Sequence, residues 1–185
     1  LCGSKLSKQY PIVEALNGIL YVVVFYATDF RWDSILYCLM TSALIVLSVI
    51  DYRTYEIPFG INVFLFVLGV IRCVFGKGDR GTLMIGFFAV SLFLLLLSLL
   101  TRGAAIGGGD IKLMAAAIVS KTYLVSLIIL AFVIGCIAGS VVHLFRMKVC
   151  GAGRMLALGP YLSVGIFIAA LWGNGMIDWY LGLFM

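Results

Sequence analysis

Long runs of apolar residues, separated by short polar stretches, dominate the sequence. Residues 87–100 read FFAVSLFLLLLSLL, continuously apolar rather than alternating. About 20 such residues cross the roughly 30 Å of hydrocarbon as a helix, and lipid offers no partner to the groups of an irregular backbone. We therefore predict an all-α, polytopic membrane helix bundle with six to seven hydrophobic segments. The segments run over residues 12–28, 34–50, 58–75, 82–101, 110–120, 122–143 and 156–172.

Two of these predicted segments are unusual in length. The segment at 110–120 is too short to span by itself unless the glycines before it lie at membrane depth. The tail at 176–185 is too short to cross, and with Trp179 and Tyr180 it is typical of an interfacial segment.

Composition and charge support a membrane protein. Of 185 residues, 64% are hydrophobic and 11% charged, whereas a soluble domain averages about 25% charged residues. The net charge is +5, but the basic residues are scattered singly, which argues against nucleic acid as a partner. If residues 1–10 are cytoplasmic, eight Lys and Arg lie on that side and five on the other, which favours this orientation. Membrane lipid is then the expected partner of the cytoplasmic basic residues.

Two carboxylates border apolar segments. Asp51 ends the run TSALIVLSVI, and Asp110 follows three consecutive glycines. A charge near the bilayer centre costs about 2.5 to more than 10 kcal/mol, so each carboxylate calls for a function or a partner. The segments 58–75 and 82–101 lie between them, and two crossings return the chain to the same side. We expect the two acids to meet as an aspartic dyad, one acting as general base on water and the other as general acid. The alternative is two unrelated interfacial acids, each solvated or paired with Arg53 or Lys112.

The residues flanking both acids predict irregular backbone. Gly107, Gly108 and Gly109 remove side-chain bulk beside Asp110, which suits the close approach of a substrate backbone; a purely structural role in helix packing is the alternative. Pro58 disfavours helix at the residue before it, so the chain should unwind after Asp51. The remaining loop and tail acids are interpreted as solvated: Asp29, Asp33, Asp79 and Asp178.

Four stretches together resemble the type IV prepilin peptidases, membrane aspartyl proteases of the GxGD class. These stretches are QYPIVEALNG at 9–18, DYRTYEIP at 51–58, GGGDIKLMAA at 107–116 and ALGPYLSVG at 157–165. They occur in the family's order and cover nearly the whole chain. The resemblance implies that residues 11–185 form the transmembrane peptidase domain and that residues 1–10 are the remnant of an upstream cytosolic loop.

The resemblance also implies an activity. Such proteins remove the short basic leader from type IV prepilin or pseudopilin precursors at the cytoplasmic face of the bacterial inner membrane. Many also N-methylate the new amino terminus with S-adenosylmethionine, and they usually carry two CxxC pairs, a zinc site, in an upstream loop. Here Cys2 alone occupies the corresponding position. One cysteine cannot form a structural zinc site, so we expect no metal site in this chain, and zinc and S-adenosylmethionine are expectations for the intact protein.

The resemblance assigns candidate roles to individual residues. Asp51 and Asp110 would be catalytic. The supporting or substrate-contacting motif residues would be Gly107, Gly108, Gly109, Pro58, Glu56 and Lys112. From helix ends, we expect Asp110 to be the ionised base, because it would begin a helix, and Asp51 the protonated acid, because it would end one.

Other functions remain open at this point. A proton- or cation-coupled transporter could use the same two acids and a glycine-broken helix, although ion sites lie near the midplane and these motifs border span ends. An archaeal preflagellin peptidase would share the GxGD motif. A relative of signal peptide peptidase would add a Pro-Ala-Leu motif, which is absent from the sequence.

Overall fold

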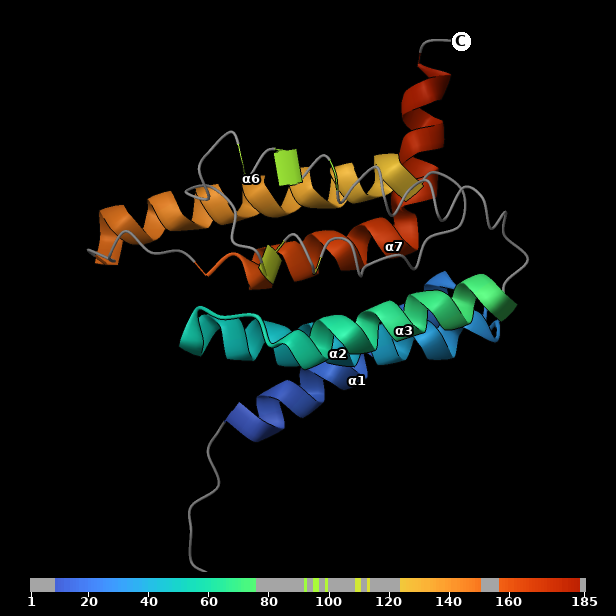
Figure 1. Cartoon of the computed structure of the whole chain (residues 1–185), viewed down its shortest axis with the longest axis horizontal. Helices are drawn as coiled ribbons and strands as arrows, with labels where there is room; N and C mark the ends of the chain where they lie inside the picture. Colours follow the sequence, from blue (N-terminus) through green and yellow to red (C-terminus); the bar gives the residue numbers. More distant parts are fainter. Residues whose placement is uncertain are drawn as a thin grey trace, which may run out of the picture.

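The computed structural model describes residues 9–75, 124–150 and 157–183, together with positions 92, 95, 96, 99, 109, 110 and 113; at 73, 124–129, 143 and 146–150 it describes the backbone alone. Five long helices make up these residues: α1 (Gln9–Ala27), α2 (Asp33–Thr54), α3 (Phe59–Phe75), α6 (Leu124–Cys150) and α7 (Gly159–Gly182) (Figure 1). The all-α prediction is thus confirmed for this part of the chain. The predicted segments at 82–101 and 110–120 fall largely outside it.

Three of the helices are long and apolar enough to cross a membrane, namely α1, α2 and α7. Shorter apolar helical stretches lie at Phe59–Arg72 and Leu130–Val142. α7 continues to Gly182, beyond the segment end expected at residue 172, so the predicted tail is part of this helix. In Figure 1 the last turns of α7, in dark red, point away from the other helices. Trp179 is exposed there, and its interfacial position stays a prediction.

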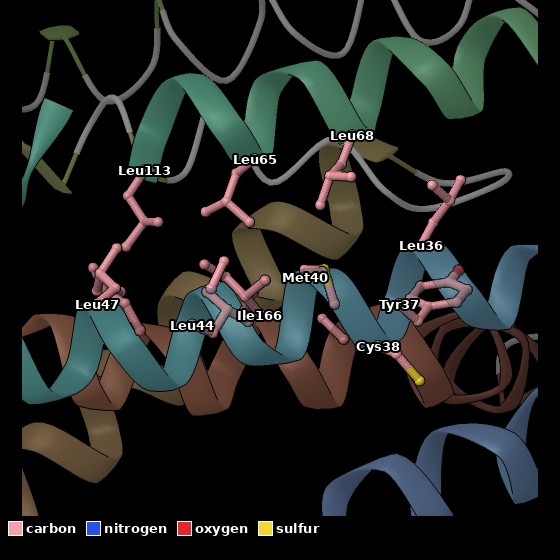
Figure 2. Close-up of a cluster of buried hydrophobic side chains, with 14 of the residues drawn as sticks. Leu36, Tyr37, Cys38, Met40, Leu44, Leu47, Leu65, Leu68, Leu113 and Ile166 are labelled. Atoms are coloured by element: carbon pink, nitrogen blue, oxygen red, sulfur yellow. The ribbon is translucent and has the colours of Figure 1, made fainter. Parts of the chain in front are cut away.

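Helix α2 lies at the centre of the described bundle. It packs against α1, α3 and α7, whereas α6 packs against α7. In its apolar window 61% of the residues are buried, compared with 6% for α1. Figure 2 shows Leu65 and Leu68 of α3 pointing toward α2, where Met40 and Leu44 are buried. Apolar contacts around α2 therefore fix the positions of its neighbours.

Glycines bring α6 and α7 close together. A Cβ atom added at Gly135 would lie 3.0 Å from the Cα of Leu162, and one added at Gly165 would lie 2.1 Å from the carbonyl oxygen of Ala131. Small residues allow such close backbone approach, which is a principal source of helix association within membranes. The packing of α6 on α7 therefore depends on having glycine, which has no side chain, at positions 135 and 165.

Gly165→Ala is expected to destabilise the protein by about 1–3 kcal/mol, the usual effect of overpacking, because its methyl group would collide with the backbone of α6. Thermal unfolding in detergent micelles measures the effect. Gly175→Ala is the matched control on the same helix, because a Cβ there meets no atom of the described residues within 4 Å. Equal unfolding temperatures for the two variants would contradict this account of the helix pair.

A buried ion pair joins α2 to α3 near the start of α2. Nη2 of Arg72 lies 3.5 Å from Oδ2 of Asp33, and both side chains are almost fully buried. Nη1 of Arg72 donates a hydrogen bond of 2.6 Å to the Tyr37 hydroxyl, and its guanidinium carbon lies 4.8 Å from the centre of that ring. The interpretation of Asp33 as a solvated turn residue is therefore wrong: at 3% exposure it belongs to the interior. Asp29 and Asp178 are exposed, as expected.

Candidate active site

Asp51 lies in the last turn of α2 and is buried, with 5% of its surface exposed. Its carbonyl oxygen accepts a hydrogen bond of 2.8 Å from the amide of Tyr55, which adopts the left-handed conformation with φ of 56° and ends the helix. Residues 56–58 are not helical, and α3 begins directly after Pro58. The predicted unwinding after Asp51 is thus confirmed, and it leaves the acid beside an irregular link.

The side chain of Asp51 reaches the beginning of α7. Its Oδ2 atom accepts a hydrogen bond of 2.8 Å from the backbone amide of Gly159, the first residue of that helix. The two residues are 108 positions apart in the sequence. The end of α2 and the start of α7 are thus joined through the carboxylate itself.

Asp110 lies on a separate segment that packs against the same region. Gly109 and Asp110 are helical and half-buried. A Cβ at Gly109 would lie 3.1 Å from Cβ of Ile57, in the link that follows α2. The segment that carries Asp110 therefore lies against the α2–α3 link.

A core contact ties the two acid-bearing segments together. Leu113 and Leu47 are both fully buried in one hydrophobic cluster, and Figure 2 shows them pointing toward each other. Leu47 precedes Asp51 by four residues and Leu113 follows Asp110 by three, spacings that place each pair on one face of a helix. The segment carrying Asp110 thus lies against α2 within a turn of Asp51. That the two carboxylates share a proton stays a prediction.

An apolar hollow of about 290 Å³ lies beside this region. It is lined by residues from α1, from α2 and from the start of α7, including Tyr52, Arg53 and Pro160. These three are sequence neighbours of Asp51 and Gly159. Arg53 donates a hydrogen bond to the side chain of Gln9 at the edge of the hollow.

Of the other predicted site residues, Glu56 and Pro58 lie in the link between α2 and α3. Glu56 is exposed, and its amide donates a 3.3 Å hydrogen bond to Oγ1 of Thr54. Pro58 accepts a 3.2 Å hydrogen bond from the amide of Ile61, which opens α3. The positions outside the described residues are Cys2, Gly107, Gly108 and Lys112.

One contact of the acids was not predicted from the sequence. Gly159 was part of a quoted motif but was not expected to be a partner of Asp51. The Gly-Pro pair at 159–160 was the sequence signal that could have indicated this contact.

The zinc ion that the resemblance implies for the intact protein finds no ligand set in the described residues. No three His, Cys, Asp or Glu side chains gather there to hold a metal ion. Cys2 lies outside this part of the chain.

The chain is similar in sequence to known proteins of one family. Residues 38–144 match the model of the type IV leader peptidase family, a region that includes both Asp51 and Asp110. A prepilin leader peptidase/N-methyltransferase of Stutzerimonas stutzeri is 30% identical over 187 residues, covering 97% of this chain and 64% of the relative. The protein of the same name from Legionella pneumophila is 31% identical over 193 residues, covering 100% of this chain and 66% of the relative.

The chain thus spans a little under two thirds of the length of these relatives. No solved structure gives a significant match. The family model covers more than half of the chain, and the relatives cover nearly all of it. The chain therefore belongs to the type IV leader peptidase family.

Proposed function

We propose that the chain is the peptidase part of a prepilin leader peptidase and that Asp51 and Asp110 are its two catalytic acids. The observation that carries the proposal is the burial of Asp51 at the α2–α7 junction, with the segment of Asp110 packed within a turn of it. Family membership supplies the reaction class. The same membership favours a peptidase over a proton- or cation-coupled transporter.

The proposed reaction is hydrolysis of one peptide bond. One carboxylate takes a proton from a water molecule while the water oxygen attacks the scissile carbonyl carbon, and the other carboxylic acid donates its proton to the carbonyl oxygen. The tetrahedral intermediate then collapses, the C–N bond breaks, and the leaving nitrogen takes a proton from the dyad. One water is consumed, one carboxyl and one amine are formed, and the shared proton returns to the pair.

The substrate and the location follow from the family resemblance and from the relatives' names. We propose type IV prepilin or pseudopilin precursors as substrates, cut at the cytoplasmic face of the bacterial inner membrane. The three candidate spans α1, α2 and α7 support a multi-pass membrane location. N-methylation with S-adenosylmethionine is proposed for the whole protein, because the relatives named prepilin leader peptidase/N-methyltransferase are longer than this chain.

The test is cleavage of pilin precursors by the native gene product, purified and reconstituted in phospholipid vesicles. Mass spectrometry of the products should show one cut, releasing a short basic leader and a mature pilin. Intact precursor after incubation with folded protein would contradict the proposal. A proton gradient that drives cation uptake into the same vesicles, again without cleavage, would favour the transporter instead.

A further inference from the structure

Every backbone N–H in the first turn of α7 donates a hydrogen bond. A helix normally leaves its first amides without partners inside the helix, and the residue before α7, Leu158, makes no side-chain capping bond. The amides of Tyr161 and Leu162 donate to the carbonyl oxygen of Leu158 at 3.1 and 3.0 Å. Pro160 has no N–H to donate. The amide of Gly159 is thus the remaining donor, and Asp51 receives it.

The same position leaves no room for a side chain. A Cβ atom at residue 159 would lie 2.7 Å from Oδ2, 2.9 Å from Cγ and 3.0 Å from Cβ of Asp51. All three atoms belong to Asp51. Because its side chain is buried, it cannot move away into solvent. Any residue other than glycine would therefore push the carboxylate out of its present position.

From these observations we propose that Gly159 is a positioning residue of the peptidase site. Its N–H holds the Asp51 carboxylate in one orientation, and its missing side chain lets α7 approach closely enough to do so. This inference rests on the proposed function for its catalytic meaning. The hydrogen bond itself is independent of that function, so the two can fail separately.

The kinetic test compares Gly159→Ala with Gly175→Ala on the same helix, where a Cβ meets no atom within 4 Å in the part of the chain that the structure describes. In the reconstituted protein, Gly159→Ala should lower kcat for precursor cleavage at least tenfold, with KM within about twofold of the parent, because substrate binding does not need the orientation of Asp51. Gly175→Ala should match the parent. A change in KM alone, or equal kcat for the two variants, would overturn the positioning role.

A second measurement covers the outcome in which Gly159→Ala fails to fold, and it needs no catalysis. In protein labelled with ¹⁵N-glycine, hydrogen exchange of the Gly159 amide should be slow, and Asp51→Ala should speed it at least tenfold while the Gly175 amide is unchanged. Unchanged exchange at Gly159 in Asp51→Ala would overturn the inference. Faster Gly159 exchange in Asp51→Ala, together with a folded parent protein that cleaves no precursor, would uphold the contact and refute the proposed function.

Discussion

Asp51→Asn is expected to reduce precursor cleavage by a factor of about 10² to 10⁴, the range that a positioned acid or base contributes. An amide can neither take a proton from water nor donate one to the substrate. The fold should persist, because the carbonyl oxygen of Asn can still accept the hydrogen bond from Gly159 that Asp51 accepts now. Initial cleavage rates, together with unfolding temperatures in detergent, measure both effects.

Asp110→Asn should cause a loss of the same size, since a dyad fails when either member is removed. The double variant should be no slower than the single variants, because both residues act in one unit. Asp178→Asn is the matched control, an identical change at an exposed acid of α7. Near-normal cleavage by either dyad variant would refute its proposed role, and loss in Asp178→Asn would point to a nonspecific effect.

Removing Arg72 is expected to have the largest effect on stability. Arg72→Met should cost about 3–5 kcal/mol, the usual result of removing one member of a buried ion pair, because Asp33 stays buried and loses the Arg72 guanidinium that lies 3.5 Å from its Oδ2. The nearby Arg31 compensates little, because its side chain is 57% exposed. Thermal unfolding in detergent gives the magnitude.

A double variant that removes both charges distinguishes the effect of an unbalanced buried charge on stability from the effect of lost packing. Asp33→Asn combined with Arg72→Met should recover most of the lost stability, because no charge then remains buried alone. Asp33 precedes Asp51 by 18 residues of one helix, or about 27 Å at 1.5 Å per residue, so cleavage per folded molecule should be unchanged in both variants. A double variant as unstable as Arg72→Met would show that the ion pair is not the cause.

The helical class and the break after Asp51 could be predicted from the sequence, because both depend on local features. Continuous apolar runs predict spanning helices, and Pro58 forbids a helix through residue 57. The extent of α7 could not be predicted in this way. Hydropathy falls after residue 172, but the backbone continues as a helix through Gly173 and Gly175 to Gly182.

Contacts between distant segments were the part that the sequence could not supply. Asp33 looked like a loop acid because its partner Arg72 follows 39 residues later on another helix. Asp51 was expected to face helix carbonyls, yet it also accepts an amide from the start of α7. That second contact weakens the argument that made Asp51 the protonated acid, so the assignment of roles within the dyad rests on titration of the pair.

The most direct test asks whether positions 51 and 110 meet. In a variant without native cysteines, Asp51→Cys with Asp110→Cys should be joined by a short bifunctional thiol reagent about as fast as Leu47→Cys with Leu113→Cys, the reference pair that faces across the core. Asp33→Cys with Asp110→Cys should remain unjoined, because Asp33 lies at the far end of α2. If the 51/110 pair behaves like the 33/110 pair while the reference pair cross-links, the two acids do not share a site and the dyad is refuted.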